Sequence, residues 1–550
     1  MPSVSSHSMW CGSLALAIAL AAASGAAAQQ PEIPTPGQAE PAQGNAPGQA
    51  QQAVPQGEQL APGEEPAEAI APQPAPQTLF GQPGYGIGGF GVSPQYLDLD
   101  LGAAYTDNAL LTRSDHMSTA IGVVGFDTDY SYTGSNLDVL TRGNIDWLKY
   151  FDNAFPSTAF GSFDGTAMWG HPSDVLQWVV EDTYTEGDAD PLAAPTPYFL
   201  EEVNYFTTGP YLNFNFTGTD RLTFYGLYSN LAFQSLPFNS QSLDAGTTFT
   251  HGLSASSSVA LQLDSAYWSF NNANATSAFF DNANVPSDYN MRSGRLVYYT
   301  QLARIRADLG TGYVFEDYGG SYSGSPLLNL DLTRQISASS SLAVHGEYGY
   351  TTFGSATRAN LAAPISAQML TGVVPAFATA APFKDHTINA GWNFARARTA
   401  FSLFGSYDRQ TYAGSSLLPL ASSTETGPIF PREIYGPSLF DNQTEGLIAA
   451  LTRKLRPTLS LGLEAFREWS QYASLDDGKV VLTVVNLSLT KRFRKLDVSG
   501  YFQRVQQGYS GAAEPLGFAT AAYTENRVGI QFTYDILGQR TPGALLPATL

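Results

Sequence analysis

Charged side chains are scarce in this 550-residue chain. Asp, Glu, Lys and Arg together make up 14% of the residues, well below the roughly 25% that is usual in globular proteins. Basic residues are the scarcest, with 27 Lys and Arg against 48 Asp and Glu, and the formal net charge is -21. The chain therefore has no basic stripe to neutralise phosphates, which excludes nucleic acid as its partner.

Long apolar runs are also missing beyond the N-terminus. A membrane-spanning helix needs about 18 consecutive apolar residues, so a helical membrane protein is excluded. Aromatic residues, in contrast, reach 12% of the chain, which also contains 52 glycines. This composition is typical of a transmembrane β-barrel, in which the lipid-facing residues alternate with polar ones.

Cysteine is almost absent, and the single Cys11 lies just before an apolar N-terminal segment, SLALAIALAAASGAAA, that ends in Ala28. This segment predicts a secretory signal peptide over residues 1–28, although no Lys or Arg precedes it. A short membrane anchor is the alternative. Cleavage after Ala28 would leave a mature chain without thiols, which suits passage through an oxidising periplasm.

Residues 29–90 begin with a low-complexity stretch of Pro, Gln, Ala, Gly and Glu. This stretch lacks the aromatic and β-branched residues needed to bury a core, so it is predicted to be a disordered periplasmic tether. The alternative is a ligand segment for a periplasmic partner. A plug domain of the active-transporter type is not expected here, which favours passive conduction.

Residues 91–536 show a period of two. Near their start, Leu97, Leu99 and Leu101 point to one face, and Asp98 and Asp100 to the other. Short polar turns such as TGSN, HPSD and TGTD alternate with longer connections rich in Gly, Pro, Ser and Asn. This asymmetry predicts an all-β, antiparallel up-and-down outer-membrane barrel of about 20 strands, within a range of about 18–22. RVGIQFTYDI is the expected last strand, and residues 537–550 form a tail.

Aromatic and basic residues gather near the expected strand ends. The aromatic residues predicted to form girdles at the membrane interfaces are Trp147, Tyr150, Phe151, Trp268, Phe270, Trp392, Phe394, Trp469 and Tyr472. Basic residues cluster at short turns, at Arg304 and Arg306, Arg396 and Arg398, Arg453, Lys454 and Arg456, and Lys491, Arg492, Arg494 and Lys495. They either reach phospholipid headgroups of the periplasmic leaflet or are ordinary solvated turn residues.

The segment YLDLDLGAAYTDNALLT and strands such as DRLTFYGLYSN and SLAVHGEYGYTTF resemble the β-barrel porins found with bacterial exopolysaccharide loci. In that family a tether precedes a barrel whose first strand is followed by a Thr-Asp-Asn element, here Thr106, Asp107 and Asn108. The resemblance covers Gln95 to about Ile536. It implies passage or export of polysaccharide across the outer membrane, with polysaccharide export components as partners, and it assigns no catalytic residue.

The polar face of the strands predicts the lining of a lumen, which a barrel of about 20 strands is wide enough to contain. The pore-lining candidates are Asp98, Asp100, Asp138, Arg142, Asp146, Asp264, Arg306, Asp308, Asp331, His345, Glu347, Asp408 and Glu464. Their acidity favours cations and neutral solutes over anions, and a neutral or weakly charged glycan over a strongly anionic one. Alternatively, these groups only keep the lumen wet.

Other functions have weaker support. His345 and Glu347 share a face and permit the base and orienter of a barrel hydrolase, but no Ser stands in a recognisable setting, and no catalytic, cofactor or metal site is predicted. A plugged barrel that anchors or docks periplasmic export machinery is the third hypothesis. The long connections 354–383 and 413–439 could constrict such a barrel. Expected partners in either case are outer-membrane lipid, lipopolysaccharide and the barrel-assembly machinery.

Overall fold

The computed structural model describes residues 96–114, 116–171, 173–188, 196–197, 200–234, 239–271, 288–318, 320–351, 383–412, 441–472, 479–510 and 522–537. The predicted signal peptide, the tether, most of the tail and the connections 354–382 and 413–439 lie outside these residues. The described strands are β1 (Tyr96–Thr106), β2 (Thr119–Thr133), β3 (Leu137–Tyr150), β4 (Thr158–Trp169), β5 (Leu176–Asp188), β6 (Leu200–Asn215), β7 (Asp220–Phe233), β8 (Ser240–Ser254), β9 (Ser257–Phe270), β10 (Tyr289–Gln301), β11 (Ile305–Tyr318), β12 (Ser321–Ser337), β13 (Ser340–Thr351), β14 (Phe383–Arg396), β15 (Thr399–Tyr412), β16 (Asn442–Arg456), β17 (Leu459–Tyr472), β18 (Lys479–Arg492), β19 (Leu496–Ser510) and β20 (Tyr523–Asp535).

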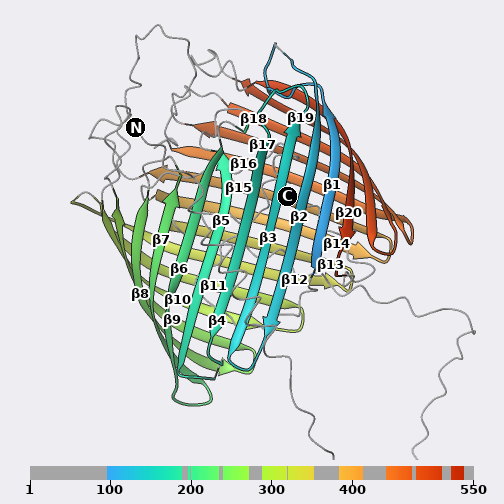
Figure 1. Cartoon of the computed structure of the whole chain (residues 1–550). Coiled ribbons are helices and arrows are strands. Elements are labelled where there is room, and N and C mark those ends of the chain that lie inside the picture. The colour runs from blue at the N-terminus through green and yellow to red at the C-terminus, as the bar shows by residue number, and fades with distance from the viewer. Residues whose placement is uncertain are drawn as a thin grey trace, which may run out of the picture. The chain divides into compact units, whose positions relative to one another are not determined.

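These strands form one closed antiparallel sheet. Each strand pairs with the next along the chain, and β20 pairs with both β19 and β1, so that the first and last strands lie side by side (Figure 1). The sheet contains 20 strands, as predicted. The expected last strand, RVGIQFTYDI, lies in β20. In the described part of the chain, no helix is long and apolar enough to cross a membrane.

The short turns lie at one end of the barrel. They join β2 to β3, β4 to β5 and every later even-numbered strand to its successor, as the sequence predicts. Short turns mark the periplasmic end of such barrels, so β1 starts and β20 ends there. The link between β11 and β12 is an exception, because it is short and lies at the opposite, extracellular end. Gly320 in this link adopts a φ of 79°, which glycine accepts without strain and which permits a tight hairpin.

Side chains on the two faces of the sheet differ in chemistry. Residues that pair across strands share a face; Leu101, for example, pairs with Val124 and Phe532, all on the outer face. These three side chains are exposed, as are many other Leu, Val, Phe and Tyr residues of the wall. Asp98 pairs with Asp127 and Asp535 on the inner face. The barrel is therefore apolar outside and polar inside, the reverse of a soluble protein.

The inner face also contains three buried apolar clusters, all toward the extracellular end. The first includes Trp268, Tyr289 and Val314 of β9–β11. The second surrounds Ile121, on β1–β4, and the third surrounds Val505, on β17–β20. We call the three clusters together the apolar collar. It lies toward the extracellular end of the inner wall, beside buried charged residues of the same face such as Glu316 and Arg527.

The prediction of aromatic girdles is only partly correct. Trp147, Phe151 and Trp392 are exposed on the outer face, and the register places Phe394 and Trp469 there as well. Tyr150, Trp268 and Phe270, however, are buried on the inner face in the apolar collar. The misassignment arose because clustering of aromatics along the sequence does not say which face each one occupies, whereas strand parity does. The side chain of Tyr472 lies outside the described part.

Candidate functional site

The register places every predicted pore-lining residue on the inner face. Asp98, Asp100, Asp138, Arg142 and Asp146 lie on β1 and β3. The remaining candidates follow around the wall: Asp264 on β9, Arg306 and Asp308 on β11, Asp331 on β12, His345 and Glu347 on β13, Asp408 on β15 and Glu464 on β17. They occupy the periplasmic and middle parts of the wall for the most part, below the apolar collar.

Four carboxylates come together on β1–β3. Asp98 lies opposite Asp127, and Asp100 and Asp146 flank Gly125 on its two sides. A Cβ atom at Gly125 would lie 1.8 Å from Oδ1 of Asp146, so this glycine makes room for the carboxylate to lean across β2 toward Asp100. Like charges at such positions repel one another. The cluster therefore favours a nearby cation over an anion.

Hydrogen bonds from β20 and β3 hold this cluster in position. Gln531 Nε2 donates to Oδ1 of Asp100 at 3.0 Å, and the hydroxyl of Thr533 donates to the same oxygen. Asn144 Nδ2 donates to Oδ2 of Asp146 at 2.9 Å. These amide and hydroxyl donors orient the carboxylates without adding positive charge, so the local surface keeps its negative potential.

Carboxylates on the opposite part of the wall are held in a similar way. Tyr225 donates its hydroxyl to Asp264 at 2.6 Å across the strand between them. The imidazole Nδ1 of His345 lies 2.6 Å from Oδ1 of Asp331 on the adjacent strand. The sequence predicts Glu347, two residues along the same strand, as the neighbour of His345. Cross-strand neighbours in a sheet come closer than residues i and i+2, which explains why Asp331 takes that position.

Alternation also identifies inner-face charges that the sequence analysis omitted. Asp127 and Asp129 alternate with Phe126 and Thr128, in the same way as the residues that were chosen. Asp129 accepts a hydrogen bond from Nε of Arg142 at 3.0 Å. The period-two pattern was therefore sufficient to find the inner-face acids of β2.

The contacts of Glu525 and Arg527 could not be predicted from the local sequence. Arg527 Nε lies 2.5 Å from Oε1 of Glu525, and the Thr106 hydroxyl donates to the same oxygen at 2.5 Å. Thr106 and Glu525 are separated by 419 positions. They meet only because β1 pairs with β20, and no local signal reports that pairing.

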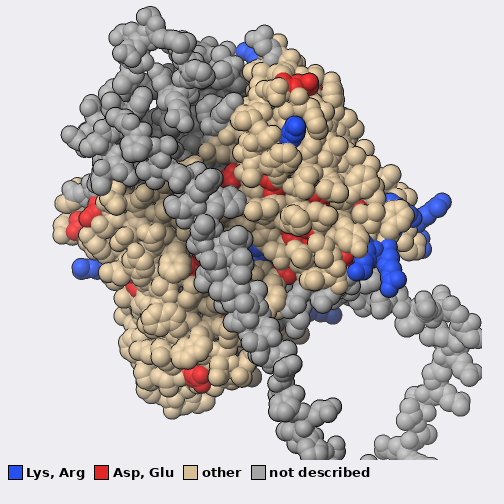
Figure 2. Space-filling model, in the orientation of Figure 1, with Lys and Arg blue, Asp and Glu red and all other residues tan. Residues whose placement is uncertain are grey.

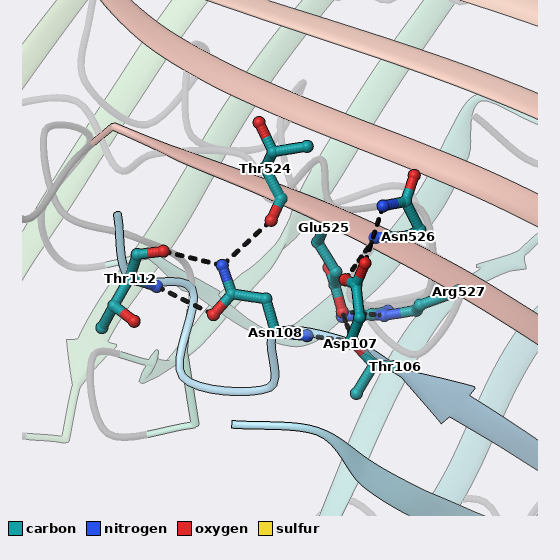
Figure 3. A network of polar contacts seen from close by, with 8 residues as sticks. All are labelled: Thr106, Asp107, Asn108, Thr112, Thr524, Glu525, Asn526 and Arg527. Atoms are coloured by element: carbon teal, nitrogen blue, oxygen red, sulfur yellow. Dashed lines mark hydrogen bonds and ion pairs between the residues drawn. The ribbon is translucent and has the colours of Figure 1, made fainter. Parts of the chain in front are cut away.

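The Thr-Asp-Asn element lies at this seam, as Figure 3 shows. Asp107 accepts hydrogen bonds from the backbone N and Nδ2 of Asn526, at 2.8 and 2.7 Å. Asn108 Nδ2 donates to the carbonyls of Thr112 and Thr524, at 2.7 and 2.9 Å. Asn108 is fully buried. The element thus fastens the extracellular end of β1, and the loop after it, to β20.

Basic side chains concentrate at the periplasmic turns. Three periplasmic turns carry most of them, namely those between β14 and β15, β16 and β17, and β18 and β19. Their basic residues are Arg396 and Arg398, Arg453, Lys454 and Arg456, and Lys491, Arg492, Arg494 and Lys495. Figure 2 shows Lys and Arg gathered at the right-hand edge of the barrel, while the wall beside them is mostly uncharged. Asp497 neutralises one of them, because its Oδ2 lies 2.9 Å from Arg492. Contact of the others with lipid headgroups stays a prediction.

A closed sheet with an apolar exterior leaves no backbone group unpaired in lipid, which is the requirement for a membrane-spanning β structure. Its short turns at one end and polar interior are those of outer-membrane barrels. The protein is a barrel of the bacterial outer membrane. Within the described ranges, no three His, Cys, Asp or Glu side chains are placed so that they could hold a metal ion.

No family model and no curated protein matches the chain. Among solved structures it is similar to the FrpB iron transporter of Neisseria meningitidis, at 9% identity and a TM-score of 0.41, covering 80% of this chain and 81% of that one. It is also similar to a mutant of the ferric enterobactin receptor PfeA of Pseudomonas aeruginosa, at 10% identity and a TM-score of 0.40, with 81% of each chain covered. The siderophore receptor PirA of the same organism gives 9% identity, a TM-score of 0.39 and 81% coverage of each chain. At these values the likeness carries no argument about ligands.

Proposed function

We propose that this barrel is a porin-like channel that passes cations and neutral solutes, including an exported neutral or weakly charged polysaccharide. The observation that carries the proposal is the acidic inner wall. Asp98, Asp100, Asp127 and Asp146 stand together on three adjacent strands, with Asp98, Asp100 and Asp146 each at most 6% exposed. More open carboxylates, such as Asp308 and Asp331, follow around the barrel. Walls of one sign concentrate ions of the opposite sign and exclude like-charged solutes.

Export of polysaccharide is the finer part of the proposal. Its support is the chemistry of the inner wall, where carboxylates, amides and hydroxyls exchange hydrogen bonds with one another, as Tyr225 does with Asp264 and Gln262 with Tyr299. Groups of this kind can also exchange hydrogen bonds with a hydroxyl-rich chain. A strongly anionic polysaccharide would be repelled by the same wall. We therefore expect a neutral or weakly charged glycan.

The test is planar-bilayer recording of the refolded full barrel in a KCl gradient. Stable steps whose reversal potential shows cation preference are expected. The triple change Asp98→Asn, Asp100→Asn and Asp146→Asn should lower that preference and leave the step size within about twofold, because carboxamides keep the shape and remove the charge. Equal reversal potentials for the native protein and the triple variant would contradict the proposal that these carboxylates select cations.

A second candidate function is a docking platform with a narrow extracellular mouth. The apolar collar favours it, because Trp268, Tyr289 and Val314 are each at most 2% exposed although they face the interior. These side chains are buried against one another inside the barrel, which narrows the lumen at that level. Absence of any conductance from a folded, heat-modifiable barrel would place this function ahead of the channel.

A further inference from the structure

The apolar outer face is interrupted on β17–β19. Arg467, Thr483 and Gln506 form one cross-strand row on this face, and Arg504 lies beside them, opposite Val485. The neighbouring rows toward the periplasm are apolar, with Leu463, Leu487 and Phe502 in one of them. We call Arg467, Thr483, Gln506 and Arg504 the outer polar patch.

The outer polar patch lies at a depth where lipid is expected. A tilted transmembrane strand crosses the hydrocarbon layer in about 9–11 residues. Counted from the first outward-facing apolar residues at the periplasmic end, Leu459 on β17 and Leu496 on β19, both arginines are the ninth residue, at the extracellular limit of such a span. A charged side chain on the lipid face is destabilising unless it reaches polar groups. At this level each arginine can reach the headgroup layer, where an anionic partner from outside the barrel wall would stabilise it.

The described part of the chain does not supply an anionic partner. Arg467 stacks over the ring of Trp469, with its Cζ 5.0 Å from the centroid. Arg504 donates to Oδ1 of Asn526 at a long 3.5 Å. Neither guanidinium forms an ion pair with a carboxylate in the part of the chain that the structure describes, and both side chains are exposed.

The two nearest outer-face acids are already engaged. Glu445, diagonal to Arg467, accepts a hydrogen bond from Gln443 at 3.0 Å. Asp107 accepts both of its bonds from Asn526. Both acids keep their charge, but in the described residues neither forms an ion pair with Arg467 or Arg504, so each guanidinium keeps N–H donors for an anion from outside the barrel.

We propose that the outer polar patch binds the phosphate groups of the glycolipid that forms the outer leaflet. Arg467 and Arg504 stand on either side of β18, two residues out of register. Strand spacing and rise place their Cα atoms about 12 Å apart. Two long side chains starting at that distance can converge on one phosphorylated sugar. Guanidinium groups bind phosphate through paired N–H donors, and Thr483 and Gln506 between them add hydrogen-bonding groups for the sugar.

The position of the aromatic neighbour agrees with this ligand. Trp469 lies two residues beyond Arg467 in the extracellular direction, at the level where indole rings favour the membrane interface. Stacking on the indole holds the guanidinium extended along the wall. It therefore directs the charge toward the headgroup layer and away from the hydrocarbon.

The experiment measures binding of purified lipid A to the folded full-length barrel in phosphatidylcholine nanodiscs. The native protein is compared with the double variant Arg467→Gln/Arg504→Gln. The control is Arg292→Gln, because Arg292 is also an exposed outer-face arginine toward the extracellular end, on β10. A heat-modifiable gel shift checks that all three proteins are folded.

We expect the double variant to bind phosphorylated lipid A at least tenfold more weakly than the native protein, and Arg292→Gln to bind it within about twofold of native. Dephosphorylated lipid A should bind the native protein as weakly as phosphorylated lipid A binds the double variant. Unchanged binding by the double variant, or equal binding of dephosphorylated lipid A or of phosphatidylglycerol, would overturn the proposal. So would a change in oligomeric mass of the double variant in lipid-free detergent, because the patch would then be a subunit contact. None of these outcomes depends on whether the barrel conducts.

Discussion

At the scale of single residues, Arg527 shows how the barrel tolerates charge in its wall. Its side chain and that of Glu525 are 11% and 1% exposed, and they face each other at 2.5 Å. An ion pair that has lost its water is stable only while both partners are present. The net contribution of the ion pair to stability is therefore smaller than the loss expected when only one of the two residues is replaced.

Changing Arg527 to Met should expose this dependence. The variant leaves Glu525 buried beside Thr106 without its counter-charge, and we expect the free energy of unfolding to fall by about 3–5 kcal/mol. The double variant Arg527→Met/Glu525→Gln should recover most of that loss, because no buried charge remains. Denaturant titration followed by gel mobility measures both. A single variant as stable as the native protein would show that water reaches Glu525.

At the residue scale, strand parity predicts the face of the sheet that a side chain occupies, whereas lining of a pore stays a prediction. Asp98, Asp146 and Glu464 alternate with apolar neighbours, and the structure places them on the inner face together with the other candidates. The hydrogen-bond partner of each inner-face group could not be predicted from the sequence. Asp331 contacts His345 on the neighbouring strand, and Glu525 contacts Thr106 across the seam. Neither contact leaves a periodic signal in the sequence.

At the scale of elements, the seam between β1 and β20 depends on the Thr-Asp-Asn element. Replacing Asp107 with Ala removes two hydrogen bonds from Asn526 to a carboxylate. Hydrogen bonds to charged groups contribute about 1.5–3 kcal/mol each, and solvent near the loop reduces that figure. We expect the temperature of the heat-modifiable transition to fall by several degrees.

A control for the seam lies in the same loop. The Ser118 hydroxyl donates to the carbonyl of Asp107 at 3.4 Å in an exposed position, so Ser118→Ala should leave the transition unchanged. If Asp107→Ala behaved like Ser118→Ala, the strand pairing alone would close the barrel. The seam element would then have no stabilising role.

The hairpin between β11 and β12 provides a second prediction about an element. Gly320 has a φ of 79°, and a Cβ at this position would meet nothing within 4 Å. Gly320→Ala should therefore cost only the backbone strain of a left-handed residue, about 1–2 kcal/mol. Gly218→Ala, in a periplasmic turn without positive φ and also with free space, is the comparison. Equal stability of the two variants would contradict a strain-based account.

At the scale of the whole molecule, the side chains of the inner wall change in composition along the barrel axis. Carboxylates occupy its periplasmic and middle parts, and the apolar collar follows toward the extracellular end. Trp268 and Tyr289 stack in this collar with ring centroids 6.0 Å apart. A permeating ion would pass mainly carboxylates in the periplasmic and middle parts, and a mixture of apolar side chains and buried polar groups such as Glu316 and Glu525 at the extracellular end.

Thinning the collar should widen the conducting path. Trp268→Ala/Tyr289→Ala removes two large inward side chains, and we expect the single-channel conductance to rise by at least 1.5-fold. Some stability would be lost as well, because large-to-small changes at buried sites leave cavities. Tyr267→Ala, on the outer face of the same strand, should leave conductance unchanged. A conductance that did not respond would place the narrowest point elsewhere.

The sequence predicted the barrel and the number of its strands, since both follow from local alternation and turn chemistry. The apolar collar was not predicted. Inward-facing aromatics such as Trp268 break the rule that the lumen face is polar, and they therefore looked like girdle residues. Trp268 has the same parity on β9 as Gln262 and Asp264, and its pairing with Ser242 and Tyr289 places it on the inner face.

Closure by the two most distant strands has a consequence for biogenesis. Until β20 is delivered to β1, every partly assembled sheet exposes two edges with unpaired N–H and C=O groups, which can join to any other strand. Contacts between residues as far apart as Thr106 and Glu525, 419 positions, are also the slowest to form by diffusion. The open sheet must therefore be protected from pairing with other chains until β20 is in place. A chain truncated before β20 would keep two unpaired edges, and we expect it to aggregate as well as to be inactive.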